Sequence, residues 1–281
     1  MSTPAIRTEG LTFVYRSQEI TALDRVDLCV QPGEFLGIIG ENGAGKTTLL
    51  KNLVGLLRPT AGRVWIDGED ASRLAVSELA LHIGFVLQNP DRQLFAQTVE
   101  EEIAFGPRNL RLGEDEIRLR VDHAIRATGL DAVRGEYPPA LPKGDRAKVV
   151  IGSVLAMRPR ILILDEPTTG QDYKGCHQIM QLARQLNREG HTLLVVTHDM
   201  ALIAEYTQRT VVLHRGRILL DDRTASVFAQ PEVLRRTHVM PPQITQLSQR
   251  LPRSFGLPCP ALTVHELGQS IVEKQSRMEE M

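Results

Sequence analysis

The sequence predicts an α/β protein whose core is a mostly parallel sheet, with a smaller antiparallel sheet formed by the N-terminal residues. Continuous apolar runs such as Phe35–Ile39 and Ile161–Leu164 are typical of strands covered on both faces. Amphipathic helix patterns separate these runs, as crossover helices separate the strands of a parallel sheet. The first residues instead alternate apolar with polar positions, which places Leu11, Phe13 and Tyr15 on one face of a half-buried strand.

The remaining elements are expected in a regular order along the chain. A helix is predicted over Thr48–Leu57, where leucine and valine recur along one stripe. A second helix is predicted over about Gly175–Asn187, between two apolar runs. Further strands are expected at Ile83–Leu87, at Leu193–Thr197, and in a hairpin in which Val211–Leu213 and Ile218–Leu220 flank Arg215 and Gly216.

Two segments depart from this alternation. Between about residues 98 and 159 the strand signal disappears and Ile117, Val121 and Ile125 mark an amphipathic helix, so we expect a helical subdomain there. After about residue 225, prolines interrupt short apolar patches, which indicates a small appended region. We therefore divide the chain into a main domain, 1–225, and a C-terminal extension, 226–281.

The composition is that of an ordinary globular protein. Hydrophobic residues make up 42% of the chain and charged residues 24%, which excludes a disordered or collagen-like chain. Lys and Arg number 33 against 34 Asp and Glu, so no overall basic field favours nucleic acid as a partner. The chain has no run of about 18 apolar residues and no signal-peptide pattern. We expect it to meet a membrane only through other chains.

A glycine-rich segment after the first core strand fits the phosphate-binding pattern GxxxxGK[ST]. In such a loop, backbone N–H groups turn toward an anion, and the N-terminus of the following helix adds partial positive charge. We expect Lys46 to reach the β and γ phosphates of a nucleotide, the Thr47 hydroxyl to bind Mg²⁺, and Thr48 to extend the site. The loop consists of Gly40, Glu41, Asn42, Gly43, Ala44, Gly45, Lys46 and Thr47.

An acidic pair ends the strand Ile161–Leu164. Asp165 is expected to hold Mg²⁺, and Glu166 to orient or deprotonate the water that attacks the nucleotide. The chain carries no NKxD-type guanine reader. We therefore expect the base of the bound nucleotide to be adenine, or the site not to discriminate between bases.

Over essentially residues 5–225 these motifs resemble the ATP-binding cassette (ABC) subunits of transporters. The resemblance implies a P-loop core with an antiparallel β subdomain and a helical signature subdomain. It implies that Tyr15 stacks on adenine and that Gln88 touches Mg²⁺ and the attacking water. It also implies that Asp172 lies in the loop that crosses to a partner subunit, and that His198 acts near the γ-phosphate beside Lys46 and Glu166.

A narrower resemblance covers Gln88–Phe95 and Thr98–Leu110, which look like the ATPase subunits of energy-coupling factor (ECF) importers for vitamins, cobalt or nickel. In that family the segment after the glutamine lines a groove for a helix of the transmembrane coupling subunit, here with Leu94 and Phe95. The resemblance also implies that the C-terminal extension, 226–281, helps to pair two ATPases. The resemblance implies a peripheral protein on the cytoplasmic face of the cell membrane, linked indirectly to a substrate-binding membrane subunit.

The chain departs from the family at the signature loop, normally LSGGQ. The family's serine and glycines bind the γ-phosphate of ATP held by the other subunit, and of these only Gly144 is kept. Pro142 offers neither hydroxyl nor N–H, Lys143 cannot adopt glycine-only backbone conformations cheaply, and Asp145 brings a negative charge. We therefore expect a heterodimer with a related ATPase that supplies an intact loop. The alternative is a variant loop that works normally.

The sequence thus predicts an ATPase, with ATP and Mg²⁺ as cofactors, that powers import across a membrane and does not bind nucleic acid. Two other functions stay open. One is a soluble ABC ATPase acting on nucleic acid or ribosomes, which the absence of a basic patch disfavours. The other is an ATP-binding regulatory subunit with little hydrolysis, which the signature loop permits and Glu166 and His198 disfavour.

Overall fold

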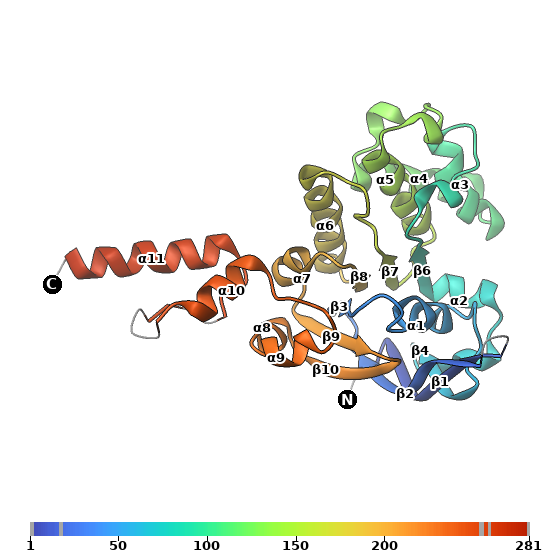
Figure 1. Ribbon diagram of the computed structural model, residues 1–281. Helices are drawn as coiled ribbons and strands as arrows, with labels where there is room; N and C mark the ends of the chain where they lie inside the picture. Colours follow the sequence, from blue (N-terminus) through green and yellow to red (C-terminus); the bar gives the residue numbers. More distant parts are fainter. Residues whose placement is uncertain (1–2, 17–18, 253–255, 258–259, 280–281) are drawn as a thin grey trace.

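Two sheets form the main body of the molecule (Figure 1). The computed structural model describes residues 3–16, 19–252, 256–257 and 260–279. In the larger sheet the strands run in the order β10-β9-β3-β8-β7-β6, and all neighbours are parallel except β9 and β10. Its strands are β3 (Phe35–Ile39), β6 (Ile83–Val86), β7 (Ile161–Asp165), β8 (Thr192–Val196), β9 (Arg209–His214) and β10 (Arg217–Arg223).

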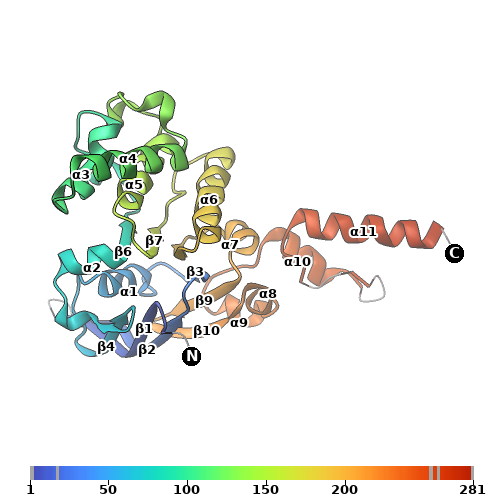
Figure 2. The same ribbon diagram turned by 180° about the vertical axis from the view of Figure 1, so that it is seen from behind.

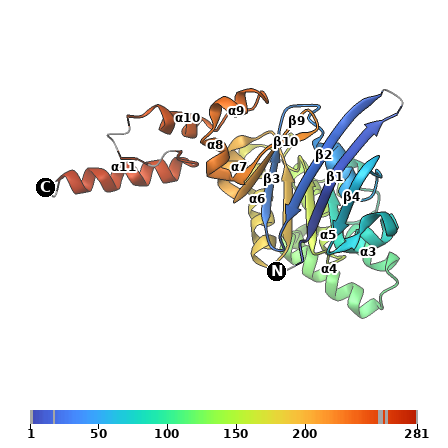
Figure 3. The same ribbon diagram turned by 90° about the horizontal axis from the view of Figure 1, so that it is seen from below.

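The smaller sheet is antiparallel and has the order β2-β1-β4-β5. Its long strands lie at the bottom of the molecule in Figure 1 and stand in front in Figure 3. Leu11 and Phe13 are buried on one face of the first strand, as the alternation predicts. The predicted fold class, a mostly parallel sheet with an antiparallel N-terminal part, is confirmed. The strands of this sheet are β1 (Ile6–Tyr15), β2 (Ile20–Val30), β4 (Ala61–Ile66) and β5 (Glu69–Asp70).

The helix α1 (Lys46–Leu53) is packed between the two sheets. Leu49, Leu50 and Leu53 are fully buried there, among apolar side chains from both sheets. Fully burying one leucine stabilises a fold by roughly 1.5–3 kcal/mol. The predicted helix, Thr48–Leu57, begins two residues too late and runs too far, because Gly55 has a φ of 76° and ends the helix in the left-handed region.

Helices cover the rest of the larger sheet. α6 (Tyr173–Arg188) and α7 (Met200–Tyr206) pack on the face opposite α1, where their side chains share one apolar cluster with the strands. α3 (Val99–Asn109), α4 (Glu114–Thr128) and α5 (Lys143–Leu155) form the top of the molecule in Figure 1 around a cluster of their own. α2 (Val76–His82) lies beside β6.

After β10, the described part of the chain contains four helices. Val227, Phe228, Leu234 and Val239 belong to the same buried cluster as α6 and α7, so the core of the main domain continues past residue 225. Figure 2 shows α10 and α11 extending away from the body. Within the described ranges, no helix combines the length and apolar character needed to cross a bilayer. The four helices are α8 (Thr224–Phe228), α9 (Pro231–Arg235), α10 (Gln243–Arg250) and α11 (Val264–Glu279).

Candidate nucleotide-binding site

The glycine-rich loop joins β3 to α1, as predicted, and two of its glycines are required by close contacts. Gly40 has a φ of 150°, and a Cβ atom there would lie 2.2 Å from the Leu213 carbonyl oxygen. Gly45 has a φ of 105°, and a Cβ atom there would lie 2.4 Å from the Ala22 carbonyl oxygen. Only glycine lets the loop pass between β9 and β2 in this conformation.

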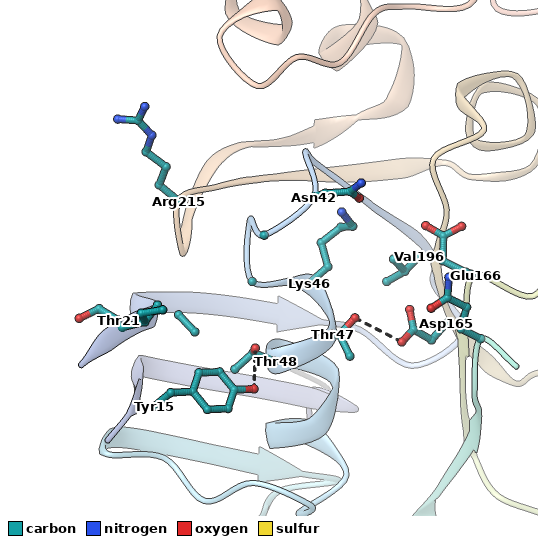
Figure 4. A pocket seen from close by; sticks show the side chains of 15 residues that line it. Tyr15, Thr21, Asn42, Lys46, Thr47, Thr48, Asp165, Glu166, Val196 and Arg215 are labelled. Atoms are coloured by element: carbon teal, nitrogen blue, oxygen red, sulfur yellow. Dashed lines mark hydrogen bonds between the residues drawn. The ribbon is translucent and has the colours of Figure 1, made fainter. Parts of the chain in front are cut away.

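A cavity of about 440 Å³ opens beside the loop (Figure 4). Most of the residues proposed from the sequence for nucleotide and Mg²⁺ binding line it. Of the other proposed site residues, Gly40, Glu41 and Ala44 belong to the loop but do not line the cavity, and neither do Gly144, Asp172 and His198. The cavity is lined by Tyr15, Ile20, Thr21, Ala22, Asn42, Gly43, Gly45, Lys46, Thr47, Thr48, Gln88, Asp165, Glu166, Val196 and Arg215.

The Lys46 side chain curls back over the loop. Its Nζ donates hydrogen bonds to the carbonyl oxygens of Gly40, at 2.7 Å, and Glu41, at 3.0 Å. Burial lowers the pKa of Lys46, and the nearby carboxylates of Glu166 and Asp165 oppose this shift. The ammonium group can therefore exchange two carbonyl partners for phosphate oxygens without leaving the loop.

Asp165 ends β7 opposite Thr47. The Thr47 hydroxyl donates to the Asp165 carboxylate at 3.5 Å, and Asp165 is only 5% exposed. Burial, and next the negative charge of Glu166, raise the pKa of Asp165. The Thr47 hydroxyl, the Asp165 carboxylate and the Gln88 amide all line the cavity, and they are oxygen donors of the kind that Mg²⁺ takes together with substrate phosphates. The donor set therefore fits Mg²⁺.

Glu166 lines the end of the cavity that lies away from Tyr15 (Figure 4), and His198, which does not line the cavity, forms a hydrogen bond with its carboxylate. The His198 Nδ1 lies 2.8 Å from Glu166 Oε2. Glu166 has a φ of 51°, and its N–H donates to the Val196 carbonyl at 2.8 Å, which holds this strained backbone in place. One carboxylate oxygen is thus engaged, and the other remains available for a water molecule.

Tyr15 lies at the opposite end of the cavity. Its hydroxyl is 3.2 Å from the Thr48 hydroxyl, and its ring packs edge-on against Phe13 with centroids 4.9 Å apart. These two contacts fix the ring at the cavity wall. Tyr15 thus lies at the end of the cavity away from Asp165 and Glu166, and its stacking on adenine stays a prediction (Figure 4).

Arg215 lines the cavity although the sequence pattern marks it only as a hairpin turn. The Gly216 N–H donates to the Ala44 carbonyl at 2.9 Å, which ties the β9–β10 turn to the phosphate loop. Arg215 has a φ of 47°, and its guanidinium points away from the loop in Figure 4. The sequence contains no signal for this contact, because it joins segments about 170 residues apart.

The signature segment corrects one part of the sequence reasoning. α5 begins at Lys143 directly after Pro142, so Lys143 and Gly144 take ordinary helical backbone and no glycine-only conformation is needed. Pro142 is the N-cap, where a missing N–H leaves no hydrogen bond of the helix unmade. Asp145 is paired with Lys148 at 3.1 Å, which offsets its negative charge.

The same segment lies against the loop that contains Asp172, away from the cavity. A Cβ atom on Gly170 would come within 2.3 Å of the Lys143 Nζ, and one on Gly144 within 3.3 Å of the Gln171 amide oxygen. Asp172 caps α6 by accepting a hydrogen bond from the Gly175 N–H at 2.7 Å. The start of α5 and the Asp172 loop thus form one surface.

The segment after Gln88 presents an aromatic pair to the outside. Phe95 is 58% exposed and packs edge-on against Phe105, which is 47% exposed, with centroids 4.6 Å apart. Leu94, in contrast, is half-buried and packs into the core. Asp91 pairs with Arg146 of α5 at 2.8 Å, which links this segment to the helix that begins at the signature loop.

A second cavity, apolar and of about 260 Å³, reaches α3 through Met157. Side chains of α2, β6 and α5 and of the residues after α1 line it, among them Leu79 and Val154, together with Met157 just past the end of α5. Met157 also contacts α3, because a Cβ atom on Gly106 would lie 2.6 Å from its Cγ. We call the exposed pair Phe95 and Phe105 together with this cavity the apolar groove.

The phosphate loop, the acidic end of β7 and the Glu166–His198 pair, on this sheet with a helical insertion, define an ATP-binding cassette. Residues 23–169 match the family model described as ABC transporter, and the chain belongs to that family. It is similar to the energy-coupling factor transporter ATP-binding protein EcfA1 of Symbiobacterium thermophilum, with 41% identity over 99% of this chain and 100% of that protein.

Solved structures agree with this assignment. The structure of cbiO1 from Clostridium perfringens, part of the ABC transporter complex cbiONQ, has a TM-score of 0.77 and 36% identity, covering 90% of this chain and 98% of that one. The cassette MJ0796, solved as a dimer with ADP and Pi, has a TM-score of 0.70 and 30% identity, covering 78% and 98%. Several curated relatives with 42% identity are longer, and the chain spans 40–44% of their length.

Proposed function

We propose that this chain is the ATP-hydrolysing subunit of a membrane importer of the energy-coupling factor type, one that takes up a vitamin or a transition-metal ion. The observation that carries the proposal is that Glu166, paired with His198, lines the same cavity as the phosphate loop. Similarity to EcfA1 and to cbiO1, along nearly the whole chain, supports the type of importer.

In this proposal, the polar side chains of the nucleotide-binding site each have a separate role in hydrolysis. Lys46 moves from its carbonyl partners to the β and γ phosphates and neutralises charge that grows on them. Thr47, Asp165 and Gln88 hold Mg²⁺, which when bound screens the phosphate charge. The free carboxylate oxygen of Glu166 accepts the proton of the attacking water, while His198 holds the other oxygen.

A second ATPase would complete the reaction. The start of α5 lies beside the Asp172 loop and away from this chain's own cavity, so it is placed to meet a nucleotide held by another subunit. The similarity to a cassette solved as a dimer supports such pairing. Pro142 supplies no hydroxyl to that nucleotide, and we propose a heterodimer whose second member carries the stronger signature loop.

The apolar groove is the proposed contact for the transmembrane coupling subunit. Phe95 and Phe105 offer exposed aromatic surface, and an apolar cavity reaches α3, the helix of Phe105, through Met157; apolar surface of this kind suits an amphipathic helix of a partner. The Asp91–Arg146 ion pair connects this contact to α5, so movement of the partner helix is transmitted to the signature loop. The chain would thereby work at the cytoplasmic face of the membrane, with the substrate-binding subunit reached indirectly.

Hydrolysis itself is tested with two lysines on the same helix. We expect Lys46→Ala to abolish phosphate release from Mg-ATP, because its ammonium group is the cation of the phosphate loop. Lys51→Ala is the matched control, because Lys51 is on α1 but does not line the cavity, and it should keep wild-type turnover. Equal activity of the two variants would contradict the proposed site.

A further inference from the structure

The segment after α9 contacts the phosphate loop through His238. The His238 Nδ1 lies 2.8 Å from the Oε2 of Glu41, the second residue of that loop. The His214 Nδ1, at the end of β9, lies 2.9 Å from the other oxygen of the same carboxylate, without the alignment of a hydrogen bond. One carboxylate of the phosphate loop is thus held between two imidazoles, about 170 and 200 residues away in sequence.

The backbone that carries His238 is fixed by its neighbours. Thr237 is fully buried and donates to the Leu234 carbonyl at 2.7 Å, and Val239 is buried in the core cluster. His238 itself has a φ of 54°, a left-handed conformation that is uncommon for residues other than glycine and asparagine. The side chain of His238 is 81% exposed, but the residues on both sides of it in sequence are buried and anchor its backbone.

The held carboxylate belongs to a residue that also contacts the catalytic lysine. The carbonyl oxygen of Glu41 accepts a hydrogen bond from Lys46 Nζ at 3.0 Å. The hydrogen bond from His238, ahead of the charge of His214, keeps the pKa of Glu41 below its usual range. A displaced Glu41 would move the first turn of the loop and would bring an unshielded negative charge toward the phosphates.

We propose that His238 is a positioning residue for the phosphate loop. Through Glu41 it holds the loop in its nucleotide-binding conformation, so that the segment following the cassette core sets the affinity for ATP. His238 does not line the cavity and touches no reacting atom. Its effect is therefore expected in nucleotide affinity rather than in the rate of the chemical step.

Two substitutions of His238 distinguish the effect of its hydrogen bond on ATP affinity from the effect of its left-handed backbone. Both His238→Gly and His238→Asn accept a φ of 54° without strain. The asparagine amide nitrogen is as many bonds from Cα as the Nδ1 of histidine, so only His238→Asn can still donate to Glu41. Arg158→Gly is the control, since Arg158 has a φ of 58° and pairs with Glu116 at 3.0 Å in the helical subdomain.

The measurement is titration of the full-length chain with a non-hydrolysable Mg-ATP analogue, after circular dichroism has shown that each variant is folded. His238→Gly should weaken binding about three- to tenfold, as expected for one charge-assisted hydrogen bond near the surface. His238→Asn and Arg158→Gly should bind within twofold of wild type. In a Glu41→Ala background, His238→Gly should change nothing further.

Three results would overturn the proposal: wild-type affinity of His238→Gly, equal weakening by His238→Asn and His238→Gly, or additive effects in the Glu41→Ala background. Phosphate release at saturating ATP gives a separate readout. It should stay within twofold of wild type in His238→Gly, because the Glu166–His198 pair is untouched. A fall in this rate without any change in affinity would assign His238 a role in chemistry and contradict the positioning role.

Discussion

Replacing Glu166 with glutamine isolates the basicity of one carboxylate. The side chain keeps its shape, and its amide oxygen can still accept the hydrogen bond from His198 that spans 2.8 Å in the wild type. The backbone bond from the Glu166 N–H to Val196 is unaffected. What is lost is the second carboxylate oxygen, the only one free to take a proton from the attacking water.

Loss of a general base lowers rates by roughly 10²–10⁴-fold. We therefore expect Glu166→Gln to reduce phosphate release by a factor of about a hundred or more. Affinity for Mg-ATP should be retained, because Lys46 and Thr47 are unchanged and one negative charge beside the phosphates is removed.

The assay is phosphate release at saturating Mg-ATP, with nucleotide binding measured on the same preparation. Both should be measured in the presence of the partner ATPase, so that a missing signature loop does not limit the wild-type rate. His198→Gln is a useful companion, because it should lower the rate less if His198 only orients the carboxylate. Turnover of Glu166→Gln within a few-fold of wild type would refute the assignment of Glu166 as the base.

Three further changes test other parts of the account. Asp165→Asn should raise the melting temperature of the chain without Mg-ATP by a few degrees at neutral pH, because burial raises the pKa of Asp165 and its charged form is therefore destabilising. The gain in melting temperature should shrink as the pH falls through that raised pKa. Calorimetry at several pH values that shows no gain would contradict this reasoning. Restoring Ser at Pro142 and Gly at Lys143 should increase ATP turnover if the signature loop is limiting, and an unchanged rate would show that the variant loop works normally. Leu50→Ala should cost about 2–5 kcal/mol in urea unfolding, because Leu50 is fully buried between the two sheets; a loss below about 1 kcal/mol would contradict that packing.

The local pattern of apolar residues in the sequence was sufficient to predict the strands of the larger sheet. Runs such as Ile161–Leu164 are apolar on every residue because both faces are covered, and this signal needs no knowledge of the rest of the chain. The phosphate loop was equally readable, since its function requires glycine at Gly40 and Gly45. The helix that follows was misplaced at its end because Gly55 ends the helix by its left-handed backbone.

Contacts between distant segments could not be predicted from the sequence. The contact of Gly216 with Ala44 of the phosphate loop, and that of His238 with Glu41, depend on how β9 and the segment after α9 pack on the sheet. The sequence reasoning at Lys143 was wrong for a related physical reason. It assumed a glycine-only backbone, whereas the segment is the first turn of α5.

Which apolar side chains are exposed to solvent also could not be predicted from the sequence and is seen only in the structure. Leu94 and Phe95 are adjacent apolar residues with the same sequence signal, yet Leu94 packs inward while Phe95 is mostly exposed against Phe105. That difference is what makes the apolar groove a candidate contact for a membrane subunit. It also supplies a variant that disturbs the surface without touching the core.

The central claim, that this chain powers a membrane importer, is tested most directly by purifying it from its native membranes in mild detergent. Partners are identified by mass spectrometry for the wild type, for Phe95→Asp, and for Leu119→Asp, which changes an equally exposed residue on α4. We predict that wild type and Leu119→Asp recover a second ATPase and a polytopic membrane protein, and that Phe95→Asp loses the membrane protein. Recovery of the wild-type chain alone, or with ribosomes, would contradict the account.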